Sequence, residues 1–294
     1  MYIKVKKPSW FKKALAERKS EHQIVVKGAK IYYQKWGSKD NPGMVLVHGT
    51  GSHSHWWDFI APSLMDLYEV VAIDLSGMGE SDHREEYKAE IFGREILSVA
   101  EDARFFNERS SPPIICGHSL GGYMSASAAS LSEKPIRGVI MIDSPIRPPD
   151  YDYSQHSHSY PIRRRKTYPN LESILERFRL TPDQDCKNQY IIDYIAKWSV
   201  QEVENGYQWK FDDSLFEKLI FEISRREVAL GLSCPLGIIY GAESALMTNE
   251  ILNYMKKQIN SETQMTCIGK AQHHVFLDQP QKTVEEIKKI ASSW

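Results

Sequence analysis

Short apolar runs alternate with helix-like stretches along most of this 294-residue chain. Such alternation is typical of a mostly parallel, twisted β-sheet with helices on both faces, because parallel strands need long crossover connections. We therefore predict an α/β fold. The predicted strands are a hairpin at 24–27 and 30–36, followed by 44–47, 70–73, 114–116, 136–142, 236–240 and 264–268. The predicted helices cover 54–67, 90–107, 122–131, 249–258 and a closing stretch from Thr283.

The alternation stops after the sixth predicted strand. Residues 146–232 contain prolines, tyrosines and helix-like stretches, but no convincing strand. A segment this long inside an α/β pattern has a structure of its own, since unstructured loops of such length are uncommon in compact domains. We predict an N-terminal extension over 1–22, a core formed by 23–145 and 233–294, and an inserted unit over 146–232.

The composition argues against several classes of function. The net charge is −1, so charge gives no reason to expect nucleic-acid binding. No apolar run reaches the length of about 18 residues that a transmembrane segment needs, and residues 1–19 lack the apolar core of a signal peptide. The four cysteines are widely spaced, and no dinucleotide or phosphate-binding motif appears. We expect a cytoplasmic protein with no metal and no cofactor.

The sequence Gly117-His118-Ser119-Leu120-Gly121 lies between an apolar run and a helix-forming stretch. A serine hydroxyl is a weak nucleophile that needs an adjacent base and a backbone shape that exposes its oxygen. Glycines on both sides allow the strand and the helix to approach closely around a strained turn. This pattern at a strand-to-helix junction predicts that Ser119 is a nucleophile.

A base for Ser119 is expected among the histidines. His273 lies in the loop after the last predicted strand, at the sheet edge where catalytic groups of open α/β sheets collect. The neighbouring His274 is the competing candidate. We predict His273 as the general base.

Four segments of the chain are similar to motifs of the α/β-hydrolase fold superfamily, in the same order. The resemblance runs from about residue 24 to the end of the chain. It implies the α/β-hydrolase fold, with the inserted unit as a helical cap over the active site. The family's spacing between the catalytic histidine and Pro280 favours His273 over His274. The four segments are His48-Gly49-Thr50-Gly51, the D-x-x-G-x-G-x-S-D turn at 74–82, the motif at 117–121, and the H-x-x-x-x-D-x-P stretch at 273–280.

Acyl transfer also requires two backbone N–H groups directed at the developing oxyanion. We predict one from Leu120, which follows the nucleophile. The second should come from the loop after His48, from Thr50, with Gly51 nearby.

The acid that orients the histidine is left open by the sequence. Most of the superfamily carries an aspartate after the seventh strand, at a position that holds Ser244 here. Asp143 ends the sixth predicted strand, where some members place their acid, and it is our preferred candidate. Glu243 is the alternative, and a histidine without a carboxylate partner is the third possibility.

A serine nucleophile that attacks a carbonyl leads to acyl transfer to water. We predict a serine hydrolase that cleaves a small carboxylic ester, thioester or lactone through an acyl-enzyme on Ser119. Dehalogenases and epoxide hydrolases of similar fold use an aspartate at this position. The alternatives are a carbon–carbon bond hydrolase of the same fold and a non-catalytic ligand-binding member.

Candidate residues for the substrate pocket come from the predicted catalytic loops and the inserted unit. We expect Trp56, Tyr123 and Met124 to line the pocket. The basic run at 163–166 either meets an anionic group of the substrate or faces solvent. The sequence does not fix the oligomeric state.

Overall fold

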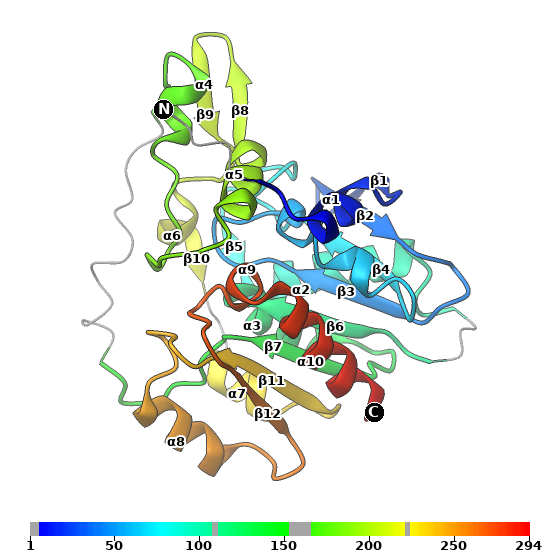
Figure 1. Ribbon diagram of the computed structural model, residues 1–294. Coiled ribbons are helices and arrows are strands. Elements are labelled where there is room, and N and C mark those ends of the chain that lie inside the picture. Colours follow the sequence, from blue (N-terminus) through cyan, green and yellow to red (C-terminus); the bar gives the residue numbers. More distant parts are fainter. Residues whose placement is uncertain (1–5, 108–110, 153–165, 221–223) are drawn as a thin grey trace.

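A computed structural model describes residues 6–107, 111–152, 166–220 and 224–294. A central sheet of eight strands runs through the molecule in the order β1-β2-β4-β3-β6-β7-β11-β12 (Figure 1). β2 pairs antiparallel with β1 and β4, and the remaining neighbours are parallel, so the predicted α/β class is confirmed. The strands are β1 Ser20–Val26, β2 Ala29–Trp36, β3 Gly43–Val47, β4 Glu69–Ile73, β6 Ile114–His118, β7 Gly138–Ile142, β11 Leu236–Gly241 and β12 Gln264–Ile268.

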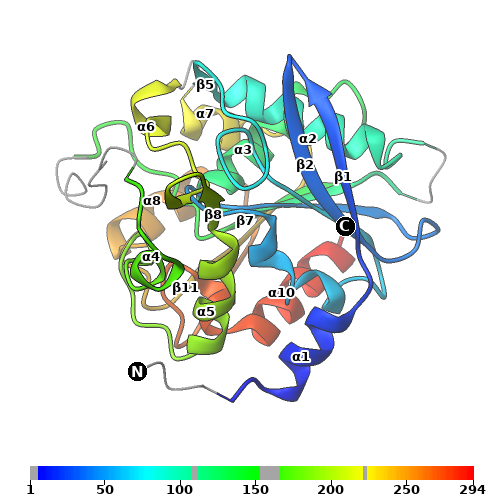
Figure 2. The same cartoon turned by 90° about the horizontal axis from the view of Figure 1, so that it is seen from above.

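Helices cover both faces of this sheet. In the view from above, α2 and α3 lie on one side of it and α1 and α10 on the other (Figure 2). In β3, Val45 and Val47 join the apolar cluster of one face, and Met44 and Leu46 join that of the other. This alternation is what a strand covered on both faces requires. The helices of the core are α1 Ser9–Ala16, α2 Ala89–Asp102, α3 Leu120–Leu131, α8 Asn249–Gln258, α9 Val275–Asp278 and α10 Pro280–Ser292.

The segment between β7 and β11 is an insertion with its own secondary structure. Its first helices and a two-stranded hairpin lie together beyond one edge of the sheet (Figure 1). Its last helix, α7, packs on the core, where Ala229 joins the same apolar cluster as Met124 of α3. The elements are α4 Leu171–Leu175, α5 Gln189–Trp198, β8 Val200–Val203, β9 Gly206–Trp209, α6 Leu215–Lys218, β10 Leu219–Ile220 and α7 Arg225–Leu230.

The expectation of an insertion without strands is therefore wrong. β8 and β9 form an antiparallel hairpin, and β10 pairs with β5, Tyr87–Lys88, which precedes α2. The sequence contains a signal for the hairpin in Asn205-Gly206, because such dipeptides favour tight turns. Gly206 has a φ of 133°, which a residue with a side chain rarely adopts.

The helix expected over 54–67 is also wrong. Two short 3₁₀ segments stand there instead, η1 Ser54–Trp57 and η2 Ala61–Ser63. Pro62 lacks a backbone N–H, and Ser63 N–H bonds to Ile60 O at 3.0 Å in the tighter 3₁₀ pattern. The helix expected over 90–107 ends at Asp102.

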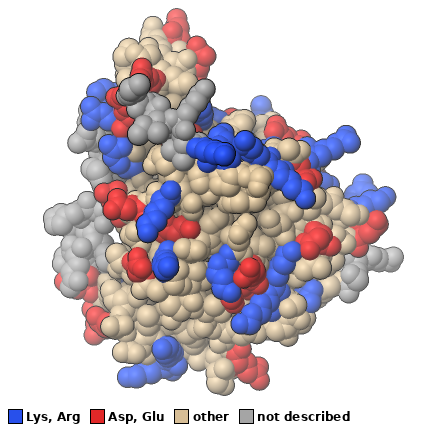
Figure 3. All heavy atoms as spheres, in the orientation of Figure 1, with Lys and Arg blue, Asp and Glu red and all other residues tan. Residues whose placement is uncertain are grey.

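The N-terminal extension contributes to the core. α1 buries Phe11 against Phe59, with ring centroids 5.7 Å apart, and the sheet already begins at Ser20. Within the described residues, no helix combines the length and apolarity needed to cross a membrane. All four cysteines are free thiols. Basic and acidic side chains are interspersed over the face shown in Figure 3, as the small net charge leads one to expect.

Candidate active site

The chain turns sharply between β6 and α3, at Ser119. This half-buried residue has φ 53° and ψ −119°, a left-handed conformation that is strained for any residue with a Cβ. A Cβ on Gly117 would lie 2.2 Å from Gly121 O, and one on Gly121 would lie 2.4 Å from His48 O. Glycine is therefore required on both sides of Ser119, and the motif forms the tight strand–turn–helix that its pattern predicts.

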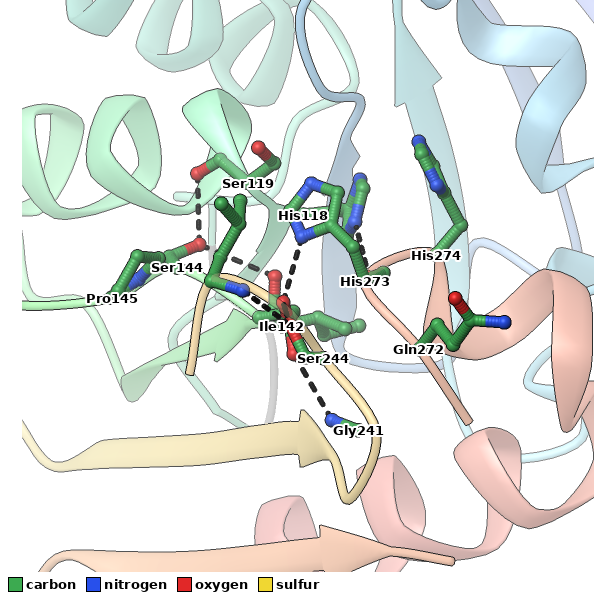
Figure 4. Close-up of polar contacts among 12 residues, drawn as sticks. His118, Ser119, Ile142, Ser144, Pro145, Gly241, Ser244, Gln272, His273 and His274 are labelled. Carbon is green, nitrogen blue, oxygen red and sulfur yellow. Dashed lines mark hydrogen bonds and ion pairs between the residues drawn. The ribbon is translucent and has the colours of Figure 1, made fainter. Parts of the chain in front are cut away.

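The neighbouring strand β7 holds the backbone of the turn. Ser119 N–H donates to Ile142 O at 2.9 Å, and the Ser144 hydroxyl donates to Ser119 O at 2.8 Å. Figure 4 shows Ser119 at the start of α3, with Ser144 on one side and His118 on the other. Both backbone polar groups of Ser119 are thus bonded to the end of β7.

His273 lies between β12 and α9 and is almost fully buried. Its Nδ1–H donates to Asp143 Oδ2 at 2.7 Å. Asp143 directly follows β7, has no exposed surface and adopts a φ of 48°. The structure therefore brings together the predicted base and the preferred one of the two candidate acids. Glu243 is exposed, and its backbone N–H bonds to Ala271 O at 2.9 Å.

Two further groups hold the carboxylate of Asp143 in place. Gly241 N–H donates to Oδ1 at 3.0 Å, and the Ser244 hydroxyl donates to Oδ2 at 2.6 Å. Ser244 occupies the position at which the superfamily usually carries its acid. It supports the displaced carboxylate instead of replacing it. Sequence reasoning treated Ser244 only as a missing acid and did not foresee this contact.

A second aspartate at a strand end, Asp74, serves as a contrast. It follows β4, and its carboxylate accepts backbone N–H groups of Ser54 at 2.5 Å and Glu80 at 2.8 Å. These bonds fix the loops after β3 and β4, and none of them involves a histidine. Burial at a strand end therefore does not by itself mark the residue that orients His273.

His118, inside the serine motif, also contacts the catalytic candidate His273. Its Nε2 lies 3.0 Å from His273 O, and the two ring centroids are 4.7 Å apart. A carbonyl oxygen only accepts, so His118 carries its proton on Nε2 and a lone pair on Nδ1. Nδ1 is buried and has no hydrogen-bond partner among the described residues.

The pKa of His118 is lowered well below its ordinary value, first by burial and then by the neighbouring charge of His273. A neutral His118 ring therefore supports the backbone of the loop that carries His273. Sequence reasoning assigned no role to His118, although its place beside Ser119 gave the necessary signal.

The loop after β3 lies against the serine turn. A Cβ on Gly49 would come within 3.3 Å of the Ser119 Cβ. Two residues later, Gly51 donates its N–H to the sulfur of Met78 at 3.3 Å. Within the described residues, no group accepts a hydrogen bond from the N–H of Thr50 or Leu120. These two donors are the pair predicted for the oxyanion.

His274 has a different environment from His273. Its backbone N–H and its Nδ1 both bond to Gln184 Oε1, at 2.9 Å and 2.8 Å, and this glutamine belongs to the insertion. Burial and the charges of His273 and His118 lower the pKa of His274 well below its ordinary value. His274 thus links the insertion to the core, and it does not bond to Asp143.

The three predicted lining residues lie in different surroundings. Trp56 is buried beside His274, with ring centroids 5.5 Å apart. Met124 is 1% exposed, within the apolar cluster between the sheet and α3. Tyr123 lines a cavity and donates its hydroxyl to Pro145 O. Of the basic run at 163–166, the three arginines lie outside the described residues.

Side chains that could ligate a metal ion do not cluster in the described part of the chain. No group of three or more histidine, cysteine, aspartate or glutamate side chains is arranged there to hold a metal ion. The carboxylate of Asp143 and the imidazole of His273 bond to each other. The chemistry available at the site is thus that of a hydroxyl, an imidazole, a carboxylate and backbone N–H groups.

Known proteins resemble this chain over most of its length. An uncharacterized hydrolase, YugF, of Bacillus subtilis (strain 168) is 23% identical over 274 residues, which cover 90% of this chain and 95% of that protein. Epoxide hydrolase 1 of Caenorhabditis elegans is 24% identical over 291 residues, which cover 92% of this chain and 70% of that protein. The crystal structure of an esterase from Mycobacterium tuberculosis, Rv0045c, matches with a TM-score of 0.71 and 18% identity, over 96% of this chain and 95% of that one.

A family profile gives the more decisive result. The profile described as "Alpha/beta hydrolase family" matches residues 44–286, which include the loop after β3, the serine turn, the insertion and the His273 loop. This range also covers every residue of the site described above. The chain therefore belongs to the alpha/beta hydrolase family.

Proposed function

We propose that this protein is a serine hydrolase that cleaves a carboxylic ester, or a related thioester or lactone, through an acyl-enzyme on Ser119. The observation that carries the proposal is the buried His273–Asp143 hydrogen bond of 2.7 Å beside a strained serine turn. A nucleophile, a base and a group that orients the base form the constellation that acyl transfer needs. Membership of a hydrolase family agrees with it.

In the proposed reaction, the Ser119 Oγ attacks the carbonyl carbon and its proton passes to His273 Nε2. Asp143 keeps the other ring proton on Nδ1 and stabilises the imidazolium that forms. The N–H groups of Thr50 and Leu120 stabilise the oxyanion of the tetrahedral intermediate. When this intermediate collapses, the leaving alcohol takes the proton from Nε2. Water then attacks the acyl-enzyme by the same steps and releases the acid.

Ser119 favours acyl transfer over epoxide opening, although several relatives are named epoxide hydrolases. Enzymes of similar fold that open epoxides carry an aspartate at this position, whose carboxylate attacks carbon directly. A serine hydroxyl lacks that charge and instead depends on a base such as His273. The esterase with a similar fold is a relative that agrees with this choice.

The test is covalent labelling with a fluorophosphonate, followed by peptide mapping, together with hydrolysis of 4-nitrophenyl esters. We expect label on Ser119 and a burst of 4-nitrophenol, and both are lost in Ser119→Ala. Ser132→Ala, which removes a half-buried serine directly after the other end of α3, is the matched control and should keep both. A folded protein that neither takes the label nor hydrolyses any ester would overturn the proposal and favour a non-catalytic ligand-binding role.

A further inference from the structure

A cavity of about 400 Å³ opens beside α3, where the insertion leaves the core and returns to it. Pro145 and Arg147 line it from the segment after β7. Ser224, Arg225 and Arg226 line it from the start of α7. Its size lies at the lower end of the range for small-molecule sites, which is about 300–1,000 Å³.

The wall of this cavity is continuous with the segments that hold Ser119. Tyr123 lines the cavity from α3, the helix that begins directly after Ser119, and donates its hydroxyl to Pro145 O. Ser144, which precedes Pro145, donates to Ser119 O at 2.8 Å. Figure 4 shows Pro145 and Ser144 on the side of Ser119 that lies away from His273. The cavity therefore shares its wall with the two segments that hold the backbone of Ser119.

All charged side chains among the described lining residues belong to three arginines, Arg147, Arg225 and Arg226. Arg226 lies 3.9 Å from the carboxylate of Glu227, whose side chain is 61% exposed. Three positive charges around one small cavity create a potential that attracts an anion.

Aromatic rings and a hydroxyl hold these arginines in place. The Arg225 guanidinium lies 5.2 Å from the ring centre of Tyr123, and that of Arg147 lies 5.2 Å from the ring of Tyr151. Arg226 donates to the Tyr254 hydroxyl at 3.3 Å. These ring contacts are cation–π interactions, and the planar fork of N–H donors of a guanidinium matches the two oxygens of a carboxylate.

We propose that this cavity binds a carboxylate of the substrate, so that the preferred substrates are small esters carrying one. The proposal rests on the proposed function and adds the substrate class to it. A hydrogen bond to a charged group stabilises a complex enough to change affinity by about 10- to 100-fold. We therefore expect a preference of about that size, expressed mainly in KM, because the carboxylate lies away from the bond that reacts.

The experiment compares matched pairs of esters with and without a carboxylate. On the acyl side the pair is 4-nitrophenyl hemiglutarate and 4-nitrophenyl hexanoate, and on the alcohol side 4-carboxyphenyl acetate and 4-methylphenyl acetate. At least one charged ester should have a kcat/KM about 10-fold or more above that of its neutral partner. Arg225→Gln and Arg147→Gln should each reduce this ratio, and Arg225→Lys should restore part of it. Equal rates within both pairs would overturn the proposal.

The matched control is Arg94→Gln on α2, whose side chain is 49% exposed and paired with Glu90. It removes the same charge at a residue that does not line the cavity and should leave the ratio unchanged. A ratio that falls equally in Arg94→Gln, or that survives in both cavity variants, contradicts the proposal. If Arg147→Gln or Arg225→Gln fails to fold, Arg226→Gln serves in its place.

A binding measurement separates this proposal from the proposed function. Calorimetric titration with glutarate should show binding that Arg225→Gln weakens, even in Ser119→Ala. If inorganic phosphate binds more tightly than glutarate, the cavity is a site for phosphate groups, and the proposal that it binds a carboxylate is wrong. Loss of Ser119 labelling with intact glutarate binding would refute the hydrolase mechanism alone. Labelling of Ser119 without any glutarate binding would refute the cavity assignment alone.

Discussion

Replacing Asp143 by asparagine keeps the shape of the side chain but reverses the hydrogen bonding of His273. Gly241 N–H donates to Oδ1, so the carbonyl oxygen of the asparagine should stay at that position. Its NH₂ group then takes the place of Oδ2, which faces His273 Nδ1. An NH₂ group donates and cannot accept, so His273 must place its ring proton on Nε2.

A histidine with its proton on Nε2 cannot take the proton of Ser119. In a serine protease with a Ser-His-Asp triad, the same replacement of aspartate by asparagine lowers kcat by about 10⁴-fold. This factor corresponds to about 5.5 kcal/mol of transition-state stabilisation. We expect a similar loss here, because Asp143 is fully buried and no water can replace its carboxylate. KM should change little.

The assay is steady-state hydrolysis of a 4-nitrophenyl ester, with circular dichroism to verify that Asp143→Asn is folded. Glu243→Gln is the control, since Glu243 is exposed and should not affect kcat. A folded Asp143→Asn that keeps more than a tenth of the activity would refute this role for Asp143. An equal loss of activity in Glu243→Gln would refute it too.

Three further predictions concern the same site. In the Asp143→Asn background, Ser244→Asp should recover part of kcat, because the Ser244 Oγ lies 2.6 Å from Asp143 Oδ2, the oxygen that binds His273. A double variant without any recovery would contradict the role given to Ser244. Ser119→Gly should be more stable than Ser119→Ala by about 1 kcal/mol in urea unfolding. Glycine relieves a backbone strain of about 1–3 kcal/mol at φ 53°, and the larger entropy of glycine in the unfolded chain cancels only part of this gain. Equal stability of the two variants would argue against the strain. Burial lowers the pKa of several histidines, which therefore stay neutral in the folded protein, whereas the same histidines in the unfolded chain take up protons below their ordinary pKa of 6.5. The free energy of unfolding is therefore highest above pH 6.5. It falls as the pH drops, by about 1.4 kcal/mol per pH unit for each such histidine. Urea unfolding at pH 7.5 and 5.5 measures this loss, and His118→Asn should flatten the slope; a stability independent of pH would show that these rings are accessible to protons. The histidines concerned are His48, His53, His118 and His274.

Two of the expectations drawn from the sequence fail where contacts made in the folded chain matter more than the local pattern. The stretch after Ser54 looks helical, but Pro62 and the buried polar contacts of Ser54 and Asp58 favour short 3₁₀ turns. Strand β10 is only two residues long and exists because it pairs with β5, which lies far away in the chain. Pro62 is a local signal that could have ended the expected helix, whereas a strand of two residues such as β10 has no local pattern by which it could be recognised before the chain folds.

The order of strands and helices, the serine turn and the approximate place of the proposed base all follow from short stretches of sequence. Each depends on neighbouring residues, such as glycines that permit a strained turn or apolar runs of strand length. Which carboxylate meets His273 is decided by tertiary structure, because Asp143 and His273 are 130 residues apart and Ser244 and Asp143 are 101 apart. Only the pairing of β7 with β11 brings the ends of both strands to one point of the sheet edge, where Asp143, Ser244 and Gly241 can meet.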